Sequence, residues 1–262
     1  MTWNDCEMTE LNDFSGFTAA TEALRPSIAQ ATQPILPGAT GRLIAAELRE
    51  DILQGFLKPG TRIGQEAVAE RFQASRIPVR DSLKLLEAEG LVTIVPNSGA
   101  WVAKLDAFEF DQIYRLREQV EGLAVRESLD RLTPPQIERL FELADRISAA
   151  KEVETFLALD REFHLLTYAG AQFSLLHELV QRFWNSTQHY RRAWAESRPD
   201  ERNWATDAEH RLIVDAIQRR DHDSAAHLVG GHIRRTRLAL APLTELFTQS
   251  APLSPAQRKP IR

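Results

Sequence analysis

Asp160 and His164 have the residue types and spacing of a metal-binding pair. They lie four residues apart in the stretch LALDREFHLL, so on a helix both side chains would project from one face. A carboxylate and an imidazole placed in this way can share a divalent ion. His210, in DAEHRLIVDAI, and His232, in VGGHIRRT, fall on two other predicted helices. The same spacing also suits a local hydrogen bond, so the residue types alone leave both interpretations open.

The neighbours of these histidines favour the metal interpretation. Phe163 precedes His164, and Ile213 and Ile217 follow His210 at helical spacing. Histidines that face an apolar core need polar partners, and one another together with a metal ion would supply them.

A second group of residues forms a cationic stripe on a predicted helix. Arg76, Arg80 and Lys84 recur every four residues in SRIPVRDSLKLLEAEGLV, which places them on one face. Ser75 can cap this helix, and Gly90 can end it with a left-handed residue. A short helix with a basic, exposed first turn suits the major groove of DNA. The alternative is a solvated surface helix.

The elements around this stripe predict a compact DNA-binding domain over residues 40–105. An amphipathic helix ends near Gly55, a second short helix spans Gln65 to Phe72, and the cationic helix is the third. Two β-rich runs, 91–95 and 100–105, follow with the turn Pro96-Asn97-Ser98-Gly99 between them. Three helices followed by a hairpin wing is the order of a winged helix-turn-helix.

The remaining folded part, residues 106–248, shows continuous helical patterning with few glycines. It predicts an all-α bundle, so the chain as a whole is mainly α. The six expected helices cover about 107–131, 133–150, 153–170, 172–197, 201–220 and 221–247, with breaks at Thr133-Pro134-Pro135, at Gly170 and at Arg198-Pro199-Asp200. The alternative is a helical bundle without a ligand site, or a dimerisation module.

Two other features of this half predict ordinary structural roles. Arg234, Arg235 and Arg237 form a basic cluster that we expect on a solvated face, with a position near an interface as the alternative. Five aromatic residues are expected to pack in the core, although they could instead line a pocket for an apolar ligand body: Phe183, Trp184, Tyr190, Trp194 and Trp204.

The composition of the chain excludes several classes of protein. The 262 residues carry a net charge of −5 and one cysteine, Cys6, which excludes an internal disulfide framework and favours a reducing cytoplasm. Residues 40–105 hold nine cations and eight anions, so DNA affinity must come from a few placed arginines. No apolar run could span a bilayer, and the first residues lack the order of a signal peptide. We expect residues 1–39 to be a partly disordered tail, with a short helix near 19–24, and residues 249–262 to be a second tail.

Residues 40–105 resemble the DNA-binding domain of GntR-family bacterial transcription regulators. The resemblance is carried by LREDILQG, LKPG, VAERF and SRIPVRDSLKLLEAEGLV. The family usually has Ser-Arg-Thr-Pro-Val-Arg followed by Glu-Ala-Leu, and this chain differs at Ile77, Asp81 and Ser82. The resemblance implies that Ser75, Gly99 and the cationic stripe meet DNA.

Two departures from the family pattern bear on DNA reading. Glu66 stands where relatives often carry a DNA-contacting arginine or a glutamine, and the wing has Ser98 and Trp101 where basic residues are common. Both would reduce phosphate attraction. The expected contacts therefore concentrate on Arg76 and Arg80 for bases or phosphates, with Lys84 reaching phosphate.

Residues 106–240 are similar to the FCD ligand-binding domain of FadR-type GntR regulators. Asp160, His164, the Glu-His of His210, His232 and the stretch DAIQRRDHDSAAHLVGGHI match its pattern. The resemblance implies that these four residues bind a divalent metal, often zinc, nickel or manganese, and that a small carboxylate effector takes the open coordination positions. It also places Arg117 toward the effector, whereas spacing alone equally supports an intrahelical pair with Glu121.

The function that these patterns predict is a ligand-responsive transcription regulator. By resemblance it is a repressor, and we expect a homodimer on palindromic operator DNA. One alternative is a regulator that senses the metal itself. Another is a metalloenzyme, since three histidines and an aspartate can activate water; the sequence lacks HExxH, nucleophile-elbow and P-loop patterns, so we expect no enzyme.

Overall fold

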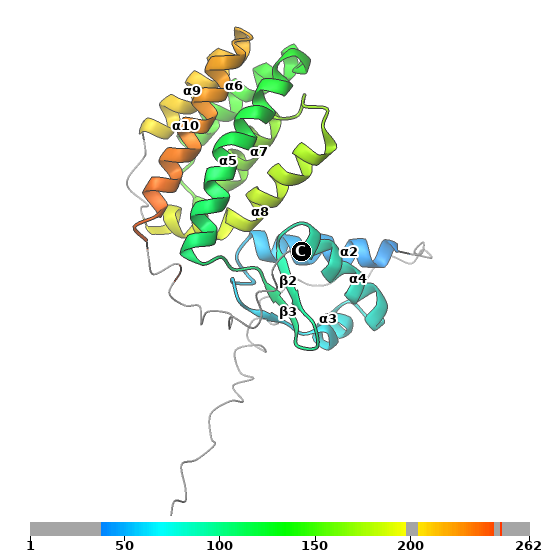
Figure 1. The fold of residues 1–262 in the computed structure, drawn as a ribbon. Helices are drawn as coiled ribbons and strands as arrows, with labels where there is room; N and C mark the ends of the chain where they lie inside the picture. Colours follow the sequence, from blue (N-terminus) through cyan, green and yellow to red (C-terminus); the bar gives the residue numbers. More distant parts are fainter. Residues whose placement is uncertain (1–37, 198–203, 244–246, 248–262) are drawn as a thin grey trace, which may run out of the picture.

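The computed structural model describes residues 38–197, 204–243 and 247. They form a small α/β domain below a larger helical bundle (Figure 1). Residues 1–37, the expected tail 249–262, the short helix near 19–24 and the break at Arg198-Pro199-Asp200 lie outside the described residues. The first helix begins at Ala39, inside the bounds expected for the first tail. The described part is mainly helical, as the sequence predicted.

The first domain has three helices and one small antiparallel sheet. Its elements are α2 Ala39–Leu53, β1 Arg62–Ile63, α3 Gln65–Arg71, α4 Arg76–Ala88, β2 Val92–Val95 and β3 Gly99–Val102. The strand order is β1-β3-β2, with Thr93 opposite Trp101 in the hairpin and Arg62 opposite Trp101 on the other side. This is the winged helix-turn-helix that the sequence predicted. The strand β1 was missed, because two residues carry no readable periodicity.

The cationic helix α4 is held by its apolar face. Val79, Leu83 and Leu86 are buried against α2 residues such as Leu48 and Ile52. Gly90 has φ 77°, the left-handed conformation that lets the chain leave the helix. Ser75 occupies the N-cap position, as predicted, but its side chain makes no capping hydrogen bond. The predicted side-chain cap is therefore wrong.

The second domain is an all-α bundle. Its elements are α5 Ala107–Ser128, the 3-10 turn Leu129–Arg131, α6 Pro134–Ala149, α7 Val153–Thr167, α8 Ser174–Ser197, α9 Trp204–Gln218 and α10 His222–Leu240. Asp106 and Thr133 form capping boxes that begin α5 and α6. Each expected helix is present. The largest difference within the described residues is at the end of α10, which stops at Leu240 rather than at 247.

Helices α5 and α10 cross at glycines. A Cβ at Gly122 would lie 3.2 Å from the carbonyl oxygen of Ala226, and one at Gly230 would lie 3.1 Å from that of Glu118. The backbones can approach this closely because neither glycine carries a side chain. The crossing brings α10, and with it His232, against the centre of the bundle.

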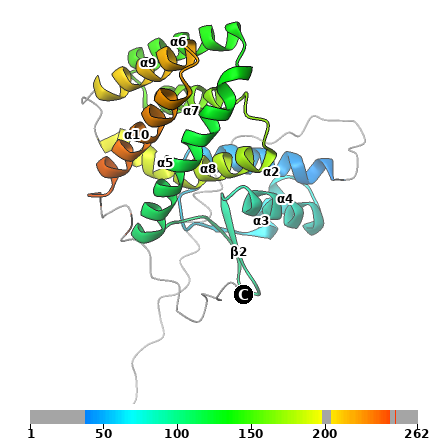
Figure 2. The ribbon, with the colours of Figure 1, turned by 45° about the horizontal axis from the view of Figure 1, so that its top comes forward.

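Helix α8 lies between the bundle and the first domain (Figure 2). Its Asn185 donates to the carbonyl of Glu89 at the end of α4, and its Arg192 donates to the carbonyl of Leu53 at the end of α2. The Tyr190 hydroxyl bonds the backbone of Leu105 at the junction of the domains. One helix of the bundle therefore contacts the ends of two DNA-domain helices.

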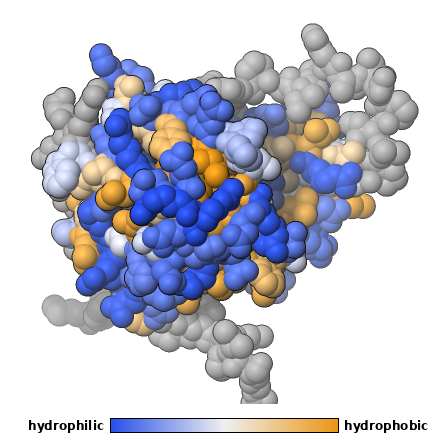
Figure 3. Space-filling model, turned by 90° about the horizontal axis from the view of Figure 1, so that it is seen from above, coloured by the Kyte–Doolittle hydropathy of each residue, from blue (hydrophilic) through white to orange (hydrophobic). Residues whose placement is uncertain are grey.

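The surface of the bundle end is mostly hydrophilic, with hydrophobic patches set between polar side chains (Figure 3). Among the helices described, none combines the length and the apolar character needed to cross a bilayer.

Candidate metal and effector site

Three helices bring the predicted histidines together. His164 on α7, His210 on α9 and His232 on α10 each offer one ring nitrogen, and these three atoms lie within 4.8 Å of one another. All three side chains are buried. Since the residues are 22 to 68 positions apart in the sequence, only the packing of the bundle can create this cluster.

Asp160 lies beside the same cluster, one turn before His164. Its Oδ1 is 3.5 Å from Nε2 of His210 and 3.8 Å from Nε2 of His164. Its Oδ2 accepts a hydrogen bond of 2.8 Å from Arg191 on α8. Burial raises the pKa of Asp160, while the neighbouring charge of Arg191 opposes that rise. The carboxylate is therefore close to the histidines but shared with an arginine.

The chemistry of this donor set fits a divalent ion. Both ring nitrogens of His210 are buried without a hydrogen-bond partner among the described residues, and such orphaned polar atoms are costly. Burial lowers the pKa of His164 and of His210 well below the usual value, so both rings are neutral near pH 7 and can act as ligands. Nitrogen with carboxylate oxygen suits zinc, nickel and manganese.

A carboxylate and a tyrosine hydroxyl contact the outer nitrogens of two of these histidines. Nδ1 of His232 is 2.7 Å from Glu209, which also accepts from Arg235 at 2.7 and 2.5 Å. Burial alone would raise the pKa of Glu209, but the hydrogen bonds from His232 and Arg235 outweigh it and lower the pKa to about 2. Nδ1 of His164 is 3.4 Å from the hydroxyl of Tyr168.

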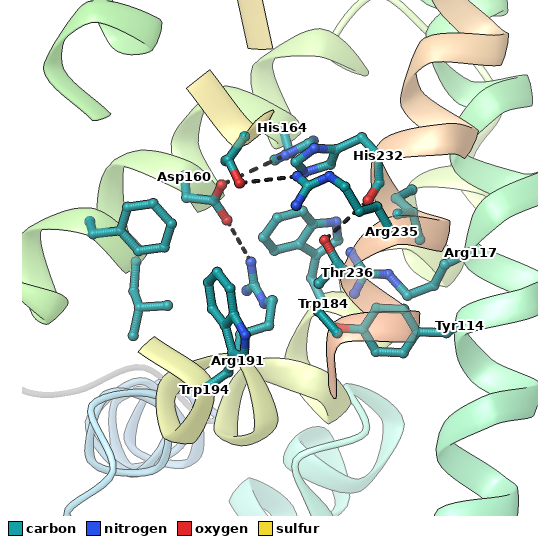
Figure 4. Close-up of a pocket in the computed structure, with 15 residues that line it drawn as sticks. Tyr114, Arg117, Asp160, His164, Trp184, Arg191, Trp194, His232, Arg235 and Thr236 are labelled. Atoms are coloured by element: carbon teal, nitrogen blue, oxygen red, sulfur yellow. Dashed lines mark hydrogen bonds and ion pairs between the residues drawn. The ribbon is translucent and has the colours of Figure 1, made fainter. Parts of the chain in front are cut away.

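A small cavity opens beside the cluster (Figure 4). Its volume is about 40 Å³, enough for a few waters or a small ligand group. The walls combine aromatic and polar side chains, among them Trp184, Trp194, Thr206 and Thr236, and the cluster residues Asp160, His164 and His232 reach it. Trp184 and Trp194 therefore line the pocket and also pack in or against the core. Phe183 and Tyr190 are buried, whereas Trp204 is 79% exposed, so the prediction of core packing is wrong for Trp204.

Arg117 lines this cavity and also makes the pair that its spacing suggested. Its Nε donates to Glu121 at 2.6 Å, and its NH1 donates to Thr187 at 3.0 Å. The guanidinium lies over the rings of Tyr114 and Trp184, at 4.8 and 4.9 Å from their centroids. Burial would lower the pKa of Arg117, but the charge of Glu121 outweighs it and raises that pKa. A charged, immobilised guanidinium thus faces the pocket.

Sequence reasoning missed two other arginines of this site. Arg191 and Arg235 both line the cavity, and each is paired with a carboxylate of the site, Asp160 and Glu209. The expectation of a solvated face is wrong for Arg235, and also for Arg237, which is paired with Glu118 and Asp111. Arg234 is exposed. The partners come from other helices, so spacing along one helix could not reveal them.

The candidate DNA-contacting residues lie on the exposed face of α4. Arg76, Arg80 and Lys84 are exposed, as is Ser75 before them. Ile77 in the first turn is 73% exposed. Arg76 forms an ion pair of 2.7 Å with Glu66 on α3. Gly99, with φ 135°, starts the second strand of the wing.

With both sites described, comparisons with known proteins decide the family. Residues 40–102 match the family of bacterial regulatory proteins called gntR, and residues 112–235 match the FCD domain. This chain belongs to the GntR family and carries an FCD domain. It is a DNA-binding transcription regulator whose second domain is an FCD effector-binding domain.

Named relatives agree with this membership. The chain is 28% identical to the HTH-type transcriptional regulator McbR of Escherichia coli over 53% of this chain and 64% of McbR. It is 26% identical to the HTH-type transcriptional repressor RspR of the same species, over 78% of this chain and 87% of that one. The solved structure of E. coli McbR/YncC matches 78% of this chain and 98% of that chain with a TM-score of 0.68 at 22% identity, which shows the shared fold.

Proposed function

We propose that this GntR regulator is a cytoplasmic repressor whose FCD domain holds a divalent metal and a small carboxylate effector. The observation that carries the proposal is the convergence of three buried histidines and Asp160 at the wall of an arginine-lined cavity. The repressor sense is supported by the name of the relative RspR.

In this proposal His164, His210, His232 and Asp160 hold the metal. The ion, which would be zinc, nickel or manganese, supplies a fixed positive charge that attracts a carboxylate. The cavity borders three of these four residues, so a ligand in it can reach the ion while the other side of the cluster stays closed by helix packing. The small volume limits the group that enters to a compact one.

Arg117 is the residue that we assign to the effector. Its guanidinium lines the same cavity as His164 and His232 (Figure 4). Because Glu121 and Thr187 already fix the guanidinium, it loses little entropy on binding an anion. A carboxylate bridging the ion and Arg117 would be recognised at both ends.

The regulator acts, we propose, as a homodimer on a palindrome. On α5, Leu116 and Leu123 lie seven residues apart on one face and expose 52% and 49% of their surface. Two-fold symmetry would present two copies of α4 to successive major grooves. Exposed leucines on a long helix suit such a contact, because burying them removes apolar surface from water.

The decisive experiment combines metal, effector and DNA in one titration. The operator is taken from selection of a randomised duplex library by the protein itself. The metal-free protein is loaded with zinc, nickel or manganese, and a panel of small mono- and dicarboxylates is then added. We expect stoichiometric metal binding, and release of DNA by one carboxylate only when metal is bound. DNA affinity that follows the metal alone would replace the carboxylate effector with metal sensing, and a protein without metal affinity would contradict the proposal.

A further inference from the structure

Glu209 determines which nitrogen of His232 carries hydrogen. Its two carboxylate oxygens already accept hydrogen bonds from Nε and NH2 of Arg235, so the group faces His232 as a hydrogen-bond acceptor. Nδ1 of His232, 2.7 Å away, must therefore be the donor. In the neutral ring this leaves Nε2 as a free lone pair, the form that a metal ligand requires.

Tyr168 plays the corresponding part for His164. Its hydroxyl donates to Oε2 of Glu121 at 2.8 Å, so the hydroxyl hydrogen is used there. The oxygen remains an acceptor, and the nitrogen that it faces, Nδ1 of His164 at 3.4 Å, must supply the hydrogen. Nε2 of His164 is again left without one.

With these two assignments, the atoms on the inner side of the cluster are hydrogen-bond acceptors. Nε2 of His164 and Oδ1 of Asp160 are 3.8 Å apart, and both are then acceptors with no hydrogen between them. Nε2 of His210 is 3.5 Å from the same oxygen. A group of facing lone pairs is repulsive unless a cation lies among them.

From this geometry we propose that Glu209 and Tyr168 are positioning residues that preset the site for a cation. Each fixes the Nδ1-protonated tautomer of one histidine, so the metal meets lone pairs that are already oriented. Glu121 extends the same arrangement, because it accepts from Tyr168, Trp184 and the effector-facing Arg117. The inference rests on the metal site of the proposed function, but its tautomer component can be measured without any metal.

The first test measures metal affinity in matched variants of the full chain. Tyr168→Phe removes only the hydroxyl, and Glu209→Gln keeps the shape of the side chain but removes its charge. Zn²⁺ and Mn²⁺ affinities are measured by competition with a chelator. We expect each variant to bind about 10- to 100-fold more weakly, the usual cost of losing such an outer partner.

Two control variants separate positioning from general loss of stability. Tyr190→Phe removes a buried hydroxyl that bonds the backbone of Leu105, and Glu118→Gln neutralises a carboxylate that accepts from Arg237. Both should retain metal affinity within about twofold while losing comparable thermal stability. Unchanged affinity in Tyr168→Phe and Glu209→Gln would overturn the proposal.

The second test determines the tautomers directly by long-range ¹H–¹⁵N NMR of the metal-free protein labelled at histidine. Wild type should show Nδ1–H for both His164 and His232, and His164 should lose this single form in Tyr168→Phe. An Nε2–H tautomer of either histidine in wild type would refute the positioning. If the wild type binds no divalent metal at all, the proposed metal function fails, whereas the tautomers still decide this inference.

Discussion

At the scale of single residues, the bond between Arg191 and Asp160 decides how the site behaves without metal. Both side chains are buried, and Arg191 also lies 3.8 Å over the ring of Trp184. A buried charge that loses its partner is strongly destabilising, by about 3–5 kcal/mol. A divalent ion next to Asp160 offers the same compensation from the opposite side.

Replacing Arg191 should therefore make folding depend on metal. For Arg191→Met we expect a loss of about 3 kcal/mol in the metal-free protein and recovery of most of it on adding zinc, since the ion then balances Asp160. Thermal unfolding with and without zinc measures both. The matched variant Arg219→Met, which breaks an exposed pair with Asp215, should change stability by less than about 1 kcal/mol in either condition. Equal losses with and without zinc in Arg191→Met would contradict this account.

His189 on α8 gives the fold a measurable sensitivity to acid. Burial lowers its pKa to about 4, below the value of about 6.5 expected in the unfolded chain. The unfolded state therefore takes up the proton first as pH falls. Stability is fully present above pH 6.5 and is lost progressively toward pH 4.

Removing this histidine should flatten that dependence. In His189→Gln we expect the free energy of unfolding to fall less steeply between pH 6.5 and pH 4, by up to about 3 kcal/mol over the interval. Urea unfolding at several pH values measures the slope. His222→Gln, a variant of an exposed histidine paired with Asp130, serves as the comparison. A slope that stays at the wild-type value in His189→Gln would show that this ring does not remain neutral in the fold.

At the scale of elements, α4 carries the cations that are proposed to bind DNA, and α8 connects the candidate site to the first domain. The apolar face of α4 is buried, which leaves its cations exposed on the opposite face. Helix α8 places Arg191 in the site and the next residue, Arg192, on the end of α2. Consecutive helical residues point about 100° apart, so one rigid element contacts the metal site and the DNA domain at once.

The DNA assignment of α4 predicts opposite effects for two variants. Arg80→Ala should reduce affinity for the selected operator below detection while the protein stays folded, because the exposed guanidinium is lost from the recognition face. Glu66→Gln should raise affinity and steepen its dependence on salt, because it removes a negative charge and releases Arg76. Electrophoretic mobility shifts from 50 to 200 mM salt measure both. Retained operator affinity in Arg80→Ala would remove α4 from the DNA interface.

At the scale of the whole molecule, the proposed dimer would hold two DNA-binding domains at a defined distance. A ligand can shift that distance only through different affinities for the two arrangements. The contacts of Asn185 and Arg192 with the first domain offer a route by which changes near Asp160 reach α2 and α4.

The proposed dimer gives a prediction at this scale. The double variant Leu116→Glu/Leu123→Glu places two charges on the exposed face of α5 and should yield a monomer, because burying unpaired carboxylates in an interface is costly. Its operator affinity should fall by at least about tenfold, while zinc binding is retained. Light scattering coupled to size-exclusion chromatography measures the mass. Leu175→Glu, a change of another exposed leucine on α8, is the control, and a dimeric double variant would rule out this face.

Much of this arrangement was predictable from local pattern, and the remainder depends on packing. Helical periodicity gave the elements of both domains, and family patterns marked His210 and His232, which the bundle then brought beside His164. Arg191 and Arg235 were not recognised, because an arginine becomes part of a site only through a partner on another helix. The strand β1 escaped for the related reason that its identity comes entirely from pairing with β3.

The close approach of α5 and α10 at their glycines would influence which ion fits the proposed metal site. His232 follows Gly230 by two residues, and a side chain at Gly230 would press on the carbonyl of Glu118 from 3.1 Å, forcing the helices apart by a few tenths of an ångström. Metal–ligand bonds tolerate only about 0.2 Å. In the proposed metal site, the close approach of the helices at Gly230 would therefore limit the distances between the metal ligands, and Gly230→Ala is expected to change metal preference before it changes the fold.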